Sequence, residues 1–153
     1  MTELTWIRSH VELLLAEEWG VCRLTADADG DWFFRAGTAA GWVSVMDTAP
    51  IMVRVFAHAA TGLKPSLKLF AELNEIERCA LSASVVLEHG TVVVSQTISP
   101  VGLSAPVLHQ ALLSVGGVAE DVGLLLASMY GGTTPFPAEP APRNEDAPGF
   151  PTE

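Results

Sequence analysis

Aspartates are concentrated in one short segment, Asp27-Ala28-Asp29-Gly30-Asp31, whose alternating carboxylates are of the kind that binds calcium. An EF-hand loop beginning at Asp27 requires glycine at its sixth position and glutamate at its twelfth. Trp32 and Thr38 stand there instead. Because Asp-Gly pairs are typical of hydrated turns, we predict a hairpin turn in this segment and no metal site.

The histidines and cysteines do not show the short ligand spacings of a zinc site. Neither Cys22 nor Cys79 has a second cysteine or a histidine two to four positions away, and both lie in apolar runs, which predicts buried free thiols. The four histidines are far apart in the sequence: His10, His58, His89 and His109.

The common catalytic motifs are also missing, including the Gly-x-Ser-x-Gly elbow, the glycine-rich phosphate loop and the His-Glu-x-x-His helix. We therefore predict that the chain is not an enzyme and uses no cofactor. Two alternatives stay open. One is a small-molecule sensor or enzyme with a pocket between sheet and helices, acting through Glu72, Glu75 or His58. The other is a structural subunit of a larger assembly.

Composition and charge limit the kinds of partner that the chain can bind. The 153 residues are 49% apolar and 17% charged, which favours one folded domain with some apolar surface left for a partner. A net charge of −10 disfavours nucleic acid and anionic membrane surfaces as partners.

The first residues lack the basic region of a signal peptide, and no uncharged apolar run reaches the roughly 20 residues of a membrane span. We expect a cytoplasmic protein.

The last part of the sequence differs from the rest. Residues 133–153 contain six of the ten prolines and four acidic residues against one basic residue. Such a segment cannot build a core. We therefore predict a single domain over residues 1–132 and a disordered, acidic, proline-rich tail over 133–153. Whether this tail covers an apolar surface of the domain as an internal competitor stays open.

Hydrophobic periodicity predicts the secondary structure. Helical spacing predicts helices over about 5–19, 65–80 and 104–129, and alternating or β-branched runs predict strands at 21–24, 32–36, 42–46, 51–58, 83–88 and 92–98. The short His89-Gly90 link predicts an antiparallel hairpin. Asn74, beside the buried stripe of the second helix, is expected to hydrogen-bond to backbone at a strand end. The order predicts a two-layer α+β fold with an antiparallel sheet and helices mainly on one face.

Residues 70–76, Phe-Ala-Glu-Leu-Asn-Glu-Ile, are followed by this hairpin and a long apolar last helix. This arrangement, over residues 4–131, resembles the type III secretion chaperone-like (CesT-like) and YbjN-type superfamily of bacterial peptide-binding chaperones. The resemblance implies an αβββαββα fold. It also implies a non-catalytic chaperone or adaptor that binds a client protein or peptide, often as a homodimer.

Strand alternation gives a candidate binding surface. We expect one set of branched side chains in these strands to point toward the helices: Val43, Val45, Ile51, Val53 and Val55. The residues between them then point away from the helices. Aromatic, methionine and arginine side chains of this kind are enriched at recognition surfaces. The predicted partner-binding residues are Phe33, Trp42, Met46, Met52, Arg54 and Phe56.

Two alternatives to this surface remain. The tail, a loop or the first helix could already cover this face, since large exposed apolar patches are uncommon on monomers. The last helix offers a competing surface, because Leu113, Leu124 and Leu125 fall off its main apolar stripe. Either surface could serve for homodimer formation.

Overall fold

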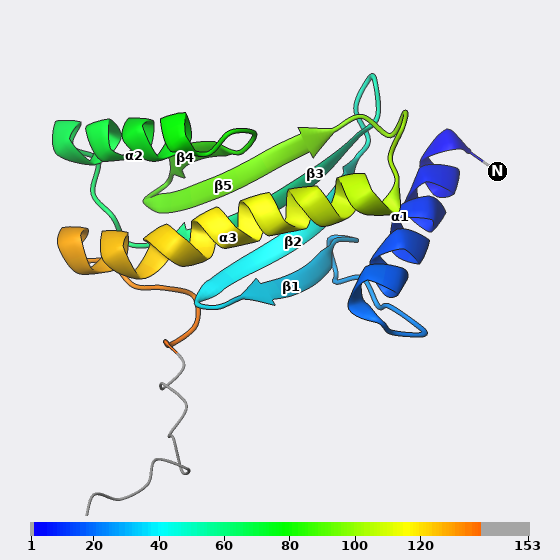
Figure 1. Cartoon of the computed structure of the whole chain (residues 1–153), viewed down its shortest axis with the longest axis horizontal. Coiled ribbons are helices and arrows are strands. Elements are labelled where there is room, and N and C mark those ends of the chain that lie inside the picture. The colour runs from blue at the N-terminus through cyan, green and yellow to red at the C-terminus, as the bar shows by residue number, and fades with distance from the viewer. Residues whose placement is uncertain (1, 139–153) are drawn as a thin grey trace, which may run out of the picture.

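The computed structural model describes residues 2–138 of the chain. Its elements follow the order helix, three strands, helix, two strands, helix (Figure 1). They are α1 (Glu3–Trp19), β1 (Trp32–Ala36), β2 (Ala39–Met46), β3 (Met52–Ala60), α2 (Leu67–Cys79), β4 (Ser84–Glu88), β5 (Thr91–Ile98) and α3 (Ala105–Tyr130).

The five strands form one antiparallel sheet in the order β1-β2-β3-β5-β4. Figure 1 shows α3 lying along one face of this sheet, with α1 at one end of it and α2 beside β4. The opposite face has no covering helix within the part of the chain that the structure describes. The predicted αβββαββα, two-layer α+β fold is therefore confirmed.

The core lies between α3 and the sheet, where α3 makes its most extensive contacts with β3. Small residues of α3 face the strands, and Gly123 comes so close to β3 that a Cβ atom placed on it would lie 2.5 Å from the carbonyl oxygen of Ala59. This close approach buries branched side chains from both layers completely. They include Val43, Val53, Val55, Val92, Val94, Val115 and Leu126.

Local sequence explains where several elements begin and turn. The hairpin between β4 and β5 turns at His89 and Gly90, and both have the positive φ that this tight turn requires. The hydroxyl groups of Thr2, Ser66 and Ser104 accept hydrogen bonds from backbone N–H groups three residues later, which caps all three helices. The predicted second hairpin is thus confirmed.

Four details of the sequence-based prediction are wrong. Residues 21–24 are not a strand, because β1 pairs only with β2 and no neighbour is available for them. The Asp-Gly turn forms but joins an irregular segment to β1, and not two paired strands. Cys22 and Cys79 are exposed free thiols, because both lie at the ends of helices or beyond. Asn74 is exposed on α2 and needs no buried partner.

The helix α3 is long and apolar enough to cross a membrane by length and composition alone. In this fold it packs against the sheet through a buried stripe that includes Leu108, Val115, Ala119 and Leu126. Burial of this stripe against the sheet accounts for part of its apolar composition, as in the core helix of a globular domain.

Candidate functional site

The six residues predicted to bind a partner lie together on the sheet face opposite the helices. The strand register places Phe33 of β1 beside Trp42 of β2, and Trp42 beside Phe56 of β3. Further along the same two strands, Met46 pairs with Met52, and Arg54 lies between Met52 and Phe56 in β3. The intervening valines are buried toward the helices, as predicted. Binding of a partner by these six residues stays a prediction.

Aromatic rings form a continuous row across this face. We call Phe136, Phe33, Trp42, Phe56 and His58 the aromatic row. Its ring centroids are separated by 6.1 Å from Phe136 to Phe33, 5.8 Å from Phe33 to Trp42 and 5.4 Å from Trp42 to Phe56. The His58 ring lies 4.9 Å from that of Trp42. These rings pack on each other and not in the hydrophobic core, so each keeps some surface toward solvent.

Two arginines lie against the row. The guanidinium carbon of Arg54 is 4.9 Å from the centroid of the Phe56 ring, and that of Arg35 is 4.5 Å from the centroid of Phe136. Such cation–π contacts keep a charged group on an apolar surface without burying it. The face therefore combines aromatic, methionine and arginine side chains, the mixture that is enriched where proteins bind other polypeptides.

The first residues of the predicted tail run along the domain. Thr133 forms a bridge with Thr61 through two backbone hydrogen bonds of 2.8 and 2.9 Å. The N–H group of Phe136 donates to the carbonyl oxygen of Thr38 at 3.0 Å, which places its ring at the end of the aromatic row. Part of the row is thus formed by this segment, 133–138. The remaining tail residues, 139–153, lie outside the described residues.

A hollow of about 350 Å³ lies on this face beside the aromatic row. One wall is formed by Trp42, Phe56 and His58, and the other by the aspartates of the turn before β1. Sequence reasoning interpreted that turn as a hydrated loop and missed its aromatic neighbours. No local signal could have joined them, because Asp29 and Phe56 are 27 positions apart and meet only through the pairing of three strands.

His58 is the titratable group of the row. Burial lowers its pKa below the ordinary value of 6.5; the nearby carboxylate of Glu88 opposes this shift and the guanidinium of Arg54 adds to it. His58 is therefore neutral at pH 7 and acts as an aromatic ring there.

We predict a pH-dependent contribution of His58 to stability. As the pH falls below 6.5, the unfolded chain takes up a proton on His58 that the folded protein resists, so the free energy of unfolding decreases. The variant His58→Phe keeps a ring and cannot be protonated. Urea unfolding followed by circular dichroism at about pH 7.5 and about pH 5.5 should give a smaller decrease for this variant than for the wild type. Equal decreases would show that His58 does not contribute.

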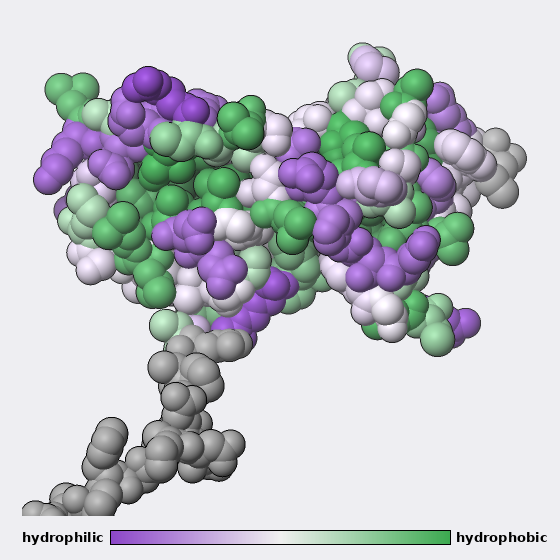
Figure 2. Space-filling view, viewed as in Figure 1, coloured by the Kyte–Doolittle hydropathy of each residue, from purple (hydrophilic) through white to green (hydrophobic). Residues whose placement is uncertain are grey.

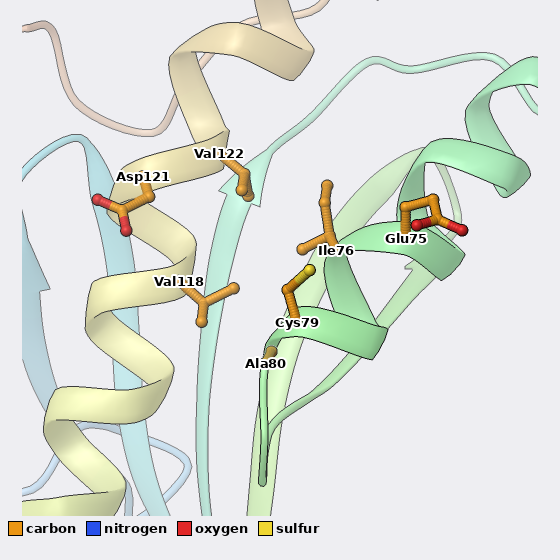
Figure 3. A pocket seen from close by; sticks show the side chains of 7 residues that line it. All are labelled: Glu75, Ile76, Cys79, Ala80, Val118, Asp121 and Val122. Atoms are coloured by element: carbon orange, nitrogen blue, oxygen red, sulfur yellow. The ribbon is translucent and has the colours of Figure 1, made fainter.

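A second hollow, of about 380 Å³, lies between α2 and α3 on the helical face (Figure 3). We call it the helix groove. Figure 3 shows Ile76 and Cys79 of α2 facing Val118 and Val122 of α3, and apolar surface is visible between these helices in Figure 2. Periodicity alone could not indicate this groove, because its two sides lie on helices that are far apart in the chain. The three leucines predicted as a competing surface, Leu113, Leu124 and Leu125, are all about half exposed.

The alternative of a small-molecule or catalytic pocket required Glu72, Glu75 or His58 to converge with other polar groups. Glu75 lines the helix groove together with Asp121, and His58 lies on the opposite face of the sheet, in the hollow that Asp27, Asp29 and Asp31 also line. The carboxylate of Glu75 forms an ion pair of 2.9 Å with Arg78. Within residues 2–138, no group of three His, Cys, Asp or Glu side chains is placed to hold a metal ion.

Comparison with known proteins gives one family and several similar folds. The family model described as "T3SS (YopN, CesT) and YbjN peptide-binding chaperone 1" matches residues 5–138. No curated protein sequence matches the chain. The structure of the ExsC–ExsE complex contains a similar chain, with a TM-score of 0.64 and 14% identity over 82% of this chain and 97% of that one.

Two further solved structures are similar. YbjN from E. coli has a TM-score of 0.58 and 15% identity, covering 77% of this chain and 92% of YbjN. A chain of the HopA1–SchA chaperone–effector complex has a TM-score of 0.53 and 18% identity, covering 82% of this chain and 93% of that one. At these identities the solved structures establish the shared fold, and the match to the family model extends over most of the chain.

Proposed function

Since the chain belongs to the family of type III secretion and YbjN peptide-binding chaperones, we propose that it binds a segment of a client protein on the open face of its sheet. The single observation that carries this proposal is the aromatic row, which runs across β1, β2 and β3 on a face without a covering helix. The proposed contact residues are Phe33, Trp42, Met46, Met52, Arg54 and Phe56.

The physical argument rests on what a client segment gains at this face. Aromatic and methionine side chains provide a large apolar area that adapts to different sequences, which suits a chaperone with limited sequence preference. Trp42 and Phe56 lie at the centre of the face, where binding energy is usually concentrated. Arg54 offers hydrogen-bond donors beside them. Binding then needs neither a cofactor nor a chemical step.

The family and the similar solved structures support a client protein as the partner. Two of the similar solved structures, ExsC–ExsE and HopA1–SchA, are complexes, and the second joins a chaperone with an effector, so we propose a client protein as the partner of this chain. We propose that the chain binds this client in the cytoplasm.

The helix groove and the exposed leucines of α3 favour a second contact surface. We propose that these residues serve in homodimer formation, which would leave the open sheet face free for the client. Light scattering coupled to size-exclusion chromatography would give the mass of the particle. A dimer mass that becomes a monomer mass in the variant Ile76→Asp, Val118→Asp would support this arrangement, and a monomeric wild type would oppose it.

A mapping experiment tests the proposed function. The full chain, labelled with ¹⁵N, would be mixed with pools of random ten-residue peptides, and the peptides that are retained would be titrated individually. We expect the backbone amide signals of Phe33, Trp42 and Phe56 to shift, together with the indole N–H signal of Trp42. The backbone amide signals of Ile76 and Val118 should stay unchanged. Shifts restricted to the helix groove would move the client site there, and the absence of any retained peptide would contradict peptide binding.

A further inference from the structure

We propose that the hollow beside the aromatic row takes one arginine or lysine side chain of the bound peptide, held between the rings of Trp42 and Phe56 and the carboxylates of Asp27, Asp29 and Asp31. This inference rests on the proposed function, since it assigns the residue type that the same face selects. We call this hollow the cation pocket.

Ring geometry gives the first argument. Trp42 and Phe56 are stacked with 23° between their planes, and His58 packs against both, 4.9 Å from Trp42 and 6.1 Å from Phe56. Three rings in mutual contact on the surface present a wall of π electrons, which attracts a cation over its face. Arg54 of the same face already lies over the ring of Phe56 in this way.

Charge gives the second argument. The wall opposite the rings carries three carboxylates, and none of them forms an ion pair within residues 2–138. Arg8, a cation bound to the turn, donates a hydrogen bond to the carbonyl oxygen of Gly30 at 2.7 Å and lies over the ring of Trp32. The Asp27 carboxylate accepts hydrogen bonds from the turn's own backbone, so an apolar side chain entering the hollow would leave the charges of Asp29 and Asp31 without a partner, whereas a cation would complement them. An anion would be repelled.

The turn that carries the carboxylates is held in place. One carboxylate oxygen of Asp27 accepts hydrogen bonds from the N–H groups of Asp29 and Asp31, at 2.9 and 3.0 Å. The backbone adds bonds from Asp27 to Asp31 and from Gly30 to Asp27, of 2.8 and 3.0 Å. A turn fixed in this way presents its charges without an ordering cost when the ligand arrives. The arrangement therefore resembles a preorganised cation site.

The occupant is a side chain and not a bare metal ion. The aromatic wall offers no oxygen ligands, and no group of three acidic, histidine or cysteine side chains within the described residues is placed for a metal. A volume of about 350 Å³ accommodates a long side chain with its methylene groups against the rings. Arginine fits best, because its planar guanidinium can stack on a ring and also donate to two carboxylates.

Peptide pools test this inference directly. Each pool of random ten-residue peptides would have one position fixed as arginine, lysine, citrulline or leucine; citrulline has the shape of arginine without its charge. We expect full-length wild-type protein to retain the arginine and lysine pools about tenfold better than the citrulline pool. The preference should weaken when sodium chloride is raised from about 0.05 M to about 0.5 M.

Matched variants locate the effect. The triple variant Asp27→Asn, Asp29→Asn, Asp31→Asn should lose the preference, and it should fold because an asparagine at position 27 keeps the oxygen that accepts the turn's hydrogen bonds. The control Glu72→Gln, Glu75→Gln, Asp121→Asn removes the same charge from the helical face and should keep the preference. Circular dichroism would verify the fold of both.

The outcomes separate the two proposals. If all pools bind equally, or if the control variant loses the preference as fully as the Asp27 triple variant, the cation pocket is wrong while peptide binding stands. If no pool is retained, the proposed function fails, and the cation pocket fails with it. As an independent readout, the indole N–H signal of Trp42 should shift with N-acetylarginine amide and not with N-acetylcitrulline amide. An unchanged signal with both compounds would contradict the pocket.

Discussion

Replacing Trp42 and Phe56 together by alanine should abolish client binding and leave the domain folded. The two rings are stacked at the centre of the open face, and their truncation would remove both the apolar area and one wall of the cation pocket. Central aromatic anchors cost about 2 kcal/mol or more each when they are truncated, so the loss of both should lower the affinity roughly 1000-fold. The measurement is fluorescence anisotropy with a labelled peptide selected by the wild type.

The fold should survive this change because neither ring belongs to the hydrophobic core. The double variant removes the ring contacts of Trp42 with Phe33, Phe56 and His58 and that of Phe56 with His58. Each such contact is worth about 0.5–1.5 kcal/mol, so we expect a measurable loss of stability without loss of the fold, which circular dichroism would verify. The matched control is Ile76→Ala, Val122→Ala, which truncates two half-buried residues of the helix groove. This control should bind the peptide normally. Retained affinity in the Trp42, Phe56 variant, or equal losses in both variants, would contradict the assignment of the site.

Two glycines of α3 should respond in opposite directions to the same substitution. In Gly123→Ala, the new methyl group would meet the carbonyl oxygen of Ala59 at 2.5 Å, so α3 must move away from β3. Overpacking of this kind costs about 1–3 kcal/mol, more than the roughly 1 kcal/mol that alanine gains over glycine in a helix. We expect the midpoint of urea unfolding to decrease.

Gly117→Ala is the internal control for this prediction. Gly117 lies in the same helix, but a Cβ atom placed on it would meet nothing within 4 Å. Alanine there should therefore stabilise the domain by up to about 1 kcal/mol through helix propensity alone. Measurement of both variants by urea unfolding gives two shifts of opposite sign if the contact with Ala59 limits the position of α3. A stabilised Gly123→Ala variant would show that α3 can move without cost.

Most helices and strands could be predicted from the sequence, because they depend on hydrophobic patterns within short segments. Branched runs with alternation predicted β2 and β3, and helical spacing predicted α1. The failures have a common cause as well. Residues 21–24 have the composition of a strand, but a strand forms only where a neighbour supplies hydrogen bonds, and the register leaves them none. Cys79 lies in an apolar run, yet it sits at the end of α2, where the groove leaves it exposed.

By itself the sequence determined which residues share a sheet face, because side chains of a strand alternate with a strict period of two. Phe33, Trp42 and Phe56 could be assigned to one surface for this reason alone. The tertiary structure alone decided what stands beside them. It brought the aspartates of the turn to the rings of Trp42 and Phe56, placed Phe136 at the end of the row, and opened the helix groove between α2 and α3. These contacts join residues far apart in the chain, and their geometry depends on strand order and helix packing, which periodicity does not encode.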